Sequence, residues 1–227
     1  MSTEILHRNT LPLGGFSGLK EHRLVMRPDL FKDIDPAESW TGLGNFVYLA
    51  DARFNPSGET KMHSHKEVDV ISIMLEGRLE HKGSLEDGQM LRTGMVQVQR
   101  AGGDGFKHNE INPDDSCNRM LQMWVLPEKA GEKADYKLYQ TKLGIVTRVY
   151  GGSKKQGDTF ASKTMVEVAS LAEGQDYQLD KEFIAYVASG HGTANQLSVK
   201  EGDLIRGESL NFLVQEGAEL VIVYQEK

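Results

Sequence analysis

Two pairs of side chains that could bind a metal ion stand far apart in this sequence. The first pair is His63 and His65, and the second is His108 and Glu110, each with one residue between its members. Residues two apart on an extended strand point to the same face, so each pair can aim both donors at one point. Three imidazole nitrogens and one carboxylate oxygen suit Fe(II), and also Mn, Ni, Cu or Zn. Four such ligands on an octahedral ion leave positions for a substrate and O2.

Both pairs lie in segments whose patterns predict β-strands. The first pair opens residues 62–77, where an apolar, β-branched run ends at a Glu-Gly turn, and we expect one buried strand there. The second pair lies in residues 106–111, between a glycine-rich turn and the Asn-Pro turn at residues 112–115. A lone His-x-His is most often incidental. The spacing alone therefore leaves open both a metal site and a chance arrangement.

The rest of the chain also has the pattern of short strands. Further strand patterns cover residues 22–26, 43–54, 78–82, 90–100, 119–126, 143–150, 164–171, 183–189, 196–199, 210–214 and 220–225. Short strands bounded by turn residues, with few helical periods, are typical of all-β sandwiches and barrels. Residues 127–140 are charged and poor in large apolar groups, which fits either a surface crossover or a boundary between domains.

The two halves of the chain share a weak internal repeat. Matching the turn after residues 183–188 to the turn at Glu76 and Gly77 places Asp176 where His63 stands and Gln178 where His65 stands. The second half thus has the strand pattern without the imidazoles. Two tandem β-barrels, of which only the first has metal ligands, explain this pattern better than one long barrel.

Composition argues against several functional classes. The net charge of -7 disfavours direct nucleic-acid binding and binding to an anionic membrane. No apolar run approaches membrane-spanning length, and we expect no signal peptide. Cys117 is the only cysteine, so no intrachain disulfide can form. We therefore expect a soluble cytoplasmic protein, and a monomer because closed barrels leave few free strand edges.

Three segments, in this order, resemble the pirin family of the cupin superfamily: HSHKEVDVISIMLEG, RAGGDGFKHNEINPD and LQMWVLPEKAG. The likeness covers residues 43–126 well and the remainder by strand pattern only. It implies an all-β bicupin, with residues 1–127 as a metal-binding cupin barrel and residues 128–227 as a second cupin barrel without metal ligands. It also implies Fe(II) as the expected ion, with metal ligands at His63, His65, His108 and Glu110.

Two further residues have expected places outside this ligand set. Asp69 stands where pirins commonly have Glu and where many other cupins have a ligand. We expect Asp69 behind the ligands or in a salt bridge, and as the replacement if Glu110 does not bind the metal. His81 follows a hairpin turn, and we expect it in solvent. The sequence predicts no specific substrate contacts.

The resemblance implies more than one function. Several bacterial pirins resemble quercetin dioxygenases, which open flavonols with O2 and release carbon monoxide. In that reaction Glu110 would be both a ligand and the general base that takes the proton of the flavonol 3-hydroxyl. Other members are iron-binding, redox-sensing regulators that bind a transcription factor or a metabolic enzyme, and a third alternative is a metal-binding cupin that acts on another small enol or phenol. We expect the first, an oxidoreductase with a small aromatic or enol substrate and O2.

Overall fold

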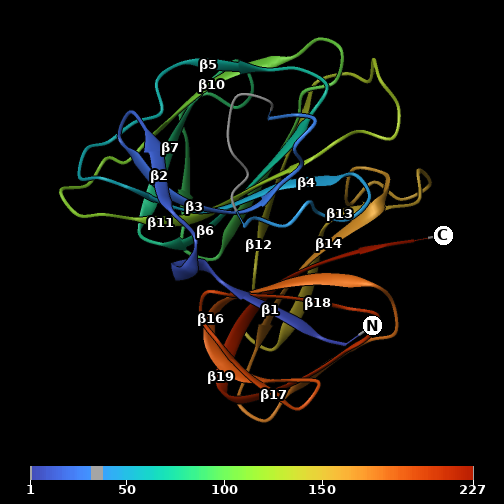
Figure 1. Ribbon diagram of the computed structural model, residues 1–227. Helices are drawn as coiled ribbons and strands as arrows, with labels where there is room; N and C mark the ends of the chain where they lie inside the picture. The colour runs from blue at the N-terminus through green and yellow to red at the C-terminus, as the bar shows by residue number, and fades with distance from the viewer. Residues whose placement is uncertain (1, 32–37, 227) are drawn as a thin grey trace. The chain divides into compact units, whose positions relative to one another are not determined.

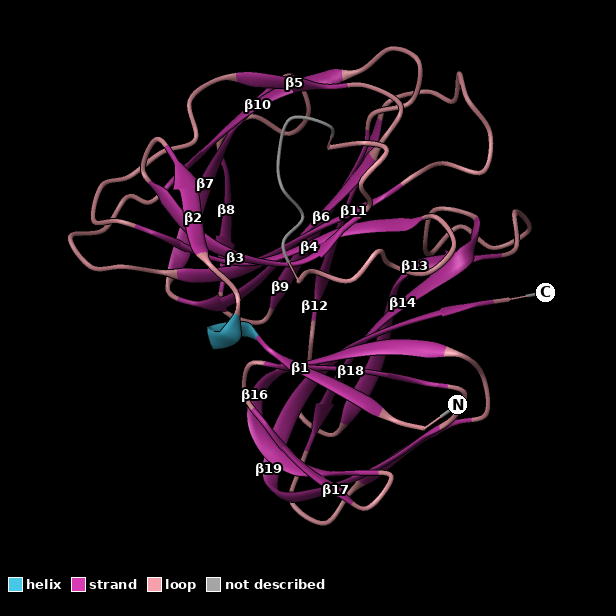
Figure 2. Cartoon of the chain, in the orientation of Figure 1, coloured by secondary structure: helices cyan, strands magenta, loops and turns pink. Residues whose placement is uncertain are grey.

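The chain folds almost entirely into β-strands. The computed structural model describes residues 2–31 and 38–226, and in this part of the chain Figure 2 shows strands and loops with one short 3-10 helix, η1 (Arg8–Thr10). The predicted all-β fold is confirmed. The chain divides into two compact units, Leu11–Gln140 and a second that combines Met1–Thr10 with Thr141–Lys227. None of the described residues belong to a helix long and apolar enough to span a membrane.

The unit Leu11–Gln140 consists of two antiparallel sheets. The larger sheet has the strand order β12 (Asp135–Gln140), β9 (Met95–Arg100), β6 (Asp69–Glu76), β11 (Arg119–Val125), β4 (Phe46–Phe54), β3 (Leu19–Met26) and β2 (Leu13–Phe16). The smaller sheet has the order β5 (His63–His65), β10 (Phe106–Ile111), β7 (Arg78–Gly83) and β8 (Gln89–Arg92). Figure 1 shows β5 and β10 side by side, as their pairing requires.

The interior of this unit contains both apolar clusters and buried polar side chains. The central strands β4, β6 and β11 are almost completely buried, in accord with their apolar sequences. An apolar cluster joins the two sheets, because Leu79 of β7 packs with Phe54 of β4 and Met74 of β6. Elsewhere polar side chains cross the interior, such as Glu110 of β10, which reaches Gln122 of β11.

The segment predicted as one strand over residues 62–77 is two strands. β5 belongs to the smaller sheet and β6 to the larger. The chain changes sheets between them, where Glu67 has a left-handed backbone conformation with φ 54°. The Glu67 carboxylate accepts a hydrogen bond from the backbone N–H of Gly131 at 3.0 Å, which helps to hold this corner. The prediction was wrong because strand-forming residues stand on both sides of the corner and hide it.

The second unit is built from one antiparallel sheet of eight strands. Its path is β1 (Glu4–His7), β18 (Asp203–Gly207), β16 (Phe183–Ala194), β19 (Leu210–Gln225), β14 (Ser162–Leu171) and β13 (Ile145–Gly152), while β15 (Asp176–Leu179) pairs with β19 and β17 (Leu197–Lys200) with β16. One continuous apolar cluster forms its core and includes Phe183, Phe212 and Ile222. Register shifts along the β16–β19 pair bend these strands, which helps one sheet to enclose the cluster.

The division between the units differs from the expected one after residue 127. Residues 135–140 form β12, which pairs with β9 and belongs to the first unit. Residues 4–7 form β1, which pairs with β18 and belongs to the second unit. Both are edge strands whose partners are distant in the chain, and such pairing leaves no mark in local composition.

Candidate metal centre

The two predicted donor pairs lie on neighbouring strands. β5 and β10 are antiparallel, and their register sets His63 directly opposite His108. His65 follows on the same face of β5, two residues on. The chain enters β10 through Gly105, which has φ +73°, and a Cβ there would lie only 2.8 Å from the carbonyl oxygen of His65. Glycine therefore allows the two strands to approach at this point.

Three imidazoles converge on one point. The Nε2 atom of His108 lies 3.0 Å from Nε2 of His63 and 3.1 Å from Nε2 of His65. Nitrogen ligands that occupy neighbouring corners of an octahedron, each about 2.1 Å from the ion, are about 3 Å apart. The observed separations therefore suit three ligands of one divalent transition metal ion.

The buried imidazoles are in the neutral form that metal binding needs. Burial, with the neighbouring imidazoles as a smaller cause, lowers the pKa of His65 to about 4 and the pKa of His108 to about 2. The Nδ1–H of His63 donates to the carbonyl oxygen of Lys61 at 2.9 Å, which leaves the lone pair of Nε2 free. Near neutral pH, protons therefore compete little with a metal ion for His65 and His108.

Glu110, the predicted fourth ligand, lies apart from the three imidazoles. It shares the inward face of β10 with His108, but its carboxylate is not among the donor atoms that lie within 4.8 Å of one another. The fully buried carboxylate accepts hydrogen bonds from Ser72 Oγ at 3.1 Å and Gln122 Nε2 at 3.2 Å. Burial raises the pKa of Glu110 to about 7. A cation nearby would remove much of the cost of ionising this carboxylate, which makes the site suitable for a metal ion.

Asp69 forms a salt bridge. Its carboxylate is fully buried and lies 3.1 Å from Nη2 of Arg100. Arg100 in turn contacts Glu132 at 2.7 Å. The Asp69 carboxylate does not belong to the histidine group, so the structure gives it no position as a substitute ligand.

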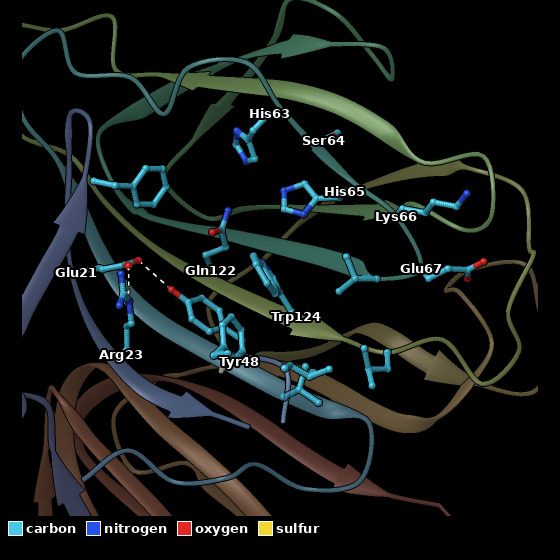
Figure 3. A pocket seen from close by; sticks show the side chains of 16 residues that line it. Glu21, Arg23, Tyr48, His63, Ser64, His65, Lys66, Glu67, Gln122 and Trp124 are labelled. Carbon is cyan, nitrogen blue, oxygen red and sulfur yellow. Dashed lines mark hydrogen bonds and ion pairs between the residues drawn. The ribbon is translucent and has the colours of Figure 1, made fainter. Parts of the chain in front are cut away.

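A cavity of about 600 Å³ opens beside the imidazoles. His63, His65 and Gln122 line it, and Figure 3 shows both imidazoles facing the same space as the Gln122 amide. Small-molecule pockets are commonly about 300–1,000 Å³. An ion held by the three histidines would therefore border a space large enough for an organic substrate.

One wall of this cavity is aromatic. Phe31, Tyr48 and Trp124 stack on one another with ring centroids 4.9 to 5.6 Å apart. The wall ends in a polar group, because the Tyr48 hydroxyl donates to Glu21 at 3.0 Å and Arg23 donates to the same carboxylate at 2.7 Å (Figure 3). Sequence reasoning did not assign these residues to a site, because they come from β3, β4, β11 and the loop at Phe31, which only the folded unit brings together.

His81 is buried, and its expected place in solvent is wrong. The register between β7 and β10 sets it opposite Glu110, and its ring centroid lies 5.4 Å from that of His108. Its Nε2–H donates to the carbonyl oxygen of Leu85 at 2.9 Å, and burial lowers the pKa of His81. The sequence carried a signal for this burial, since Leu79 and His81 are two apart and share one face of β7.

The residues that the internal repeat matches to the histidine pair have no comparable arrangement. Asp176 and Gln178 lie on β15 with exposed side chains, and Gln178 Nε2 donates to Asp176 at 2.8 Å. Within residues 2–31 and 38–226, the cluster of three candidate donors is the one in the first unit.

Residues 30–125 match the family model described as Pirin. A protein of Zymomonas mobilis named "Putative quercetin 2,3-dioxygenase" is 27% identical over 187 residues, which are 76% of this chain and 79% of that protein. The quercetin 2,3-dioxygenase of Escherichia coli K12 is 32% identical over 76 residues, which are 33% of this chain and 32% of that enzyme.

The solved structure of the bacterial pirin YhhW from Escherichia coli, in complex with nickel(II), has a similar fold. It aligns with a TM-score of 0.84 and 17% sequence identity, over 99% of this chain and 99% of that chain. At this identity the likeness establishes the fold, which is two tandem cupin barrels.

Proposed function

Residues 30–125 belong to the pirin family, and we propose that this chain is a metal-dependent dioxygenase that opens flavonols such as quercetin with O2 and releases carbon monoxide. The observation that carries the proposal is the convergence of three imidazoles at the edge of a cavity with an aromatic wall. The names of the relatives from Zymomonas mobilis and Escherichia coli support the same reaction.

The three histidines would hold the ion, and Glu110, whose carboxylate lies outside the histidine group in the metal-free chain, would join them as the fourth ligand when an ion binds. We propose Fe(II), because three nitrogens and one carboxylate oxygen with open positions suit it. When bound, the ion supplies a Lewis acid for the substrate oxygen and a route for electrons from the substrate to O2. His63 and His65 both line the cavity, so an ion held by these imidazoles would border the substrate space.

The cavity positions the flavonol. Its flat rings lie against the aromatic wall, where Tyr48 and Trp124 provide the largest surfaces. At the far end of the wall, Arg23 and Glu21 offer a donor and an acceptor for hydroxyl groups on the flavonol rings. The apolar wall also keeps water from the reacting ring.

Glu110 takes the proton of the flavonol 3-hydroxyl. Gln122 lines the cavity and donates to the Glu110 carboxylate at 3.2 Å, which joins this base to the wall of the substrate space. Loss of the proton makes the central ring electron-rich. Both atoms of O2 then enter the ring-opened product, and one ring carbon leaves as carbon monoxide.

Aerobic incubation of the iron-loaded protein with quercetin tests this proposal. We expect the long-wavelength absorbance of the flavonol to fall and carbon monoxide to be trapped by reduced myoglobin. Omission of O2 and the His63→Ala variant are the controls, and both should leave the flavonol intact. Unchanged absorbance with a fully loaded site would contradict the proposed reaction without contradicting the metal site.

A further inference from the structure

Two buried imidazole nitrogens next to the histidine cluster have no hydrogen-bond partner among the described residues. They are Nδ1 of His108 and Nδ1 of His81. Both side chains are completely buried, and their ring centroids are 5.4 Å apart with 53° between the ring planes. Buried polar atoms nearly always have a partner in folded proteins. Two such atoms on adjacent rings therefore need an explanation.

The His108 atom is a donor when the site holds a metal. Its Nε2 faces the other two imidazoles at 3.0 and 3.1 Å and is the atom that would bind the ion. A neutral imidazole has a hydrogen on only one of its two nitrogens, so metal binding through Nε2 places the N–H hydrogen on Nδ1.

The His81 atom is an acceptor. Its Nε2 lies 2.9 Å from the carbonyl oxygen of Leu85, which can only accept, so Nε2 carries the hydrogen. Nδ1 of the neutral ring then has a free lone pair. The Gln99 amide lies farther from the same Nε2, at 3.4 Å, and does not change this assignment.

We propose that His81 is a positioning residue for the metal ligand His108, whose Nδ1–H donates to Nδ1 of His81 through one bound water molecule. The inference rests on the metal site of the proposed function. It gives His108 the same kind of support that His63 receives from the Lys61 carbonyl oxygen at 2.9 Å. Such partners fix the tautomer and the orientation of a ligating imidazole, and their loss commonly weakens metal binding by about 10–100-fold.

The backbone around His81 keeps it beside the ligand strand. Two residues on, Gly83 pairs with His108, and a Cβ on Gly83 would collide with the carbonyl oxygen of Lys107. Only glycine allows β7 to lie this close to β10 at the ligand. His81 therefore cannot move far from His108 without breaking the pairing of the two strands.

A matched pair of variants tests the proposal. Asn and Leu have similar branching and size, and both lose the bond to Leu85, but in His81→Asn an amide oxygen replaces Nδ1 as the acceptor. We expect His81→Leu to weaken Co(II) binding by about 10–100-fold, measured by competition with a chelator. We expect His81→Asn to remain within about threefold of the unmodified protein.

A spectroscopic readout separates positioning from general loss of structure. In the Co(II)-loaded protein, the N–H protons of ligating imidazoles give strongly shifted proton resonances. We expect one of these, from His108, to exchange slowly with D2O in the unmodified protein and in His81→Asn, and rapidly in His81→Leu. His22→Phe is the control: this imidazole also contacts a backbone carbonyl oxygen in the same unit, that of Leu11 at 3.2 Å. It should change neither affinity nor exchange.

Equal affinity and equal exchange in His81→Asn and His81→Leu would overturn the inference and leave the proposed function intact. If neither variant folds, the exchange rate measured in the unmodified protein still tests the proposal, because rapid exchange of the His108 N–H with D2O would exclude a buried acceptor. Failure of the unmodified protein to bind Co(II) would overturn the metal site and this inference together.

Discussion

The two units use similar strands around very different interiors. The second unit is filled by one continuous apolar cluster that contains Phe183 and Phe212. The first unit has several smaller apolar clusters, and buried polar side chains such as His81, His108 and Glu110 occupy the space between its sheets. A cupin barrel can thus enclose either a core or a site, and the side chains that point inward decide which.

The buried carboxylates show the same contrast. In the second unit, Glu167 accepts hydrogen bonds from the hydroxyls of Tyr177 at 2.9 Å and Tyr224 at 3.0 Å, and Arg148 lies 3.1 Å away. This carboxylate has the cation that it needs. In the first unit, the neutral side chains of Ser72 and Gln122 bind Glu110. An added cation would stabilise the Glu110 carboxylate, whereas the Glu167 carboxylate already has Arg148 as its cation.

The largest expected effect is the loss of the metal on removal of one imidazole. His63→Ala should reduce bound metal from about one ion per chain to nearly none, because removing a ligand costs more than the roughly 10–100-fold loss typical of its supporting partners. Elemental analysis of protein purified without added metal measures this. Asp176→Ala, at the matching position of the second unit, should change nothing. Equal metal content in His63→Ala and the unmodified protein would refute the site.

A cavity in the second core should destabilise the protein without affecting the site. Phe212 is completely buried in the apolar cluster, and Phe212→Ala should lower the free energy of unfolding by about 3–5 kcal/mol, read from urea denaturation. The adjacent Leu213 is 50% exposed, and Leu213→Ala should cost less than about 0.5 kcal/mol. Loss of bound metal from folded Phe212→Ala would show that the two interiors are not independent.

The pH dependence of stability should separate the two carboxylate environments. In the metal-free protein, folding raises the pKa of Glu110 from 4.5 to about 7, so its favourable contribution is complete below pH 4.5 and is lost as the pH rises through 7. The free energy of unfolding of metal-free Glu110→Gln, relative to that of the unmodified protein, should therefore rise by about 2–3 kcal/mol between pH 4.5 and pH 8. Thermal unfolding across this range measures the gain. With metal bound, the unmodified protein should be the more stable of the two, since Gln cannot supply the carboxylate. A difference in stability between the two metal-free proteins that stays constant with pH would contradict the proposed environment of Glu110.

The smallest expected effect concerns the network in the second unit. Tyr177→Phe removes one donor to Glu167 but leaves Tyr224 and Arg148 in place, so we expect a loss of about 1 kcal/mol in the free energy of unfolding. Metal affinity should stay the same. A loss above about 3 kcal/mol would indicate that the network is less completely satisfied than its contacts imply.

Local sequence pattern was sufficient for much of the fold and for part of the site. The spacing of His63 and His65 places both side chains on one face of a strand. His108 lies opposite His63 on the neighbouring strand, so the three imidazoles can converge once both segments are recognised as strands. The predicted fourth ligand was harder to place. Spacing places Glu110 on the correct face, but the direction of its carboxylate depends on Ser72 and Gln122, which come from two other strands.

The features that sequence reasoning missed depend on contacts between distant segments. The corner at Glu67 moves the histidine pair into a different sheet from β6, although the hydrophobic pattern continues across it. The burial of His81 depends on β7 packing against β10, and the only local sign of it is that His81 shares one face of β7 with the apolar Leu79. Pairing register is decided by partners along the whole chain, so a local window could not contain it.

The pairing of β1 with β18 has a consequence for the order in which the two units can fold. Glu4 and Arg206 form an ion pair at 2.7 Å, although they are 202 residues apart in the sequence. Leu11–Gln140 is one continuous segment, whereas β1 pairs with β18, which follows that whole segment in the sequence. The first unit can therefore fold from one continuous segment, whereas the second unit needs strands from both sides of that segment.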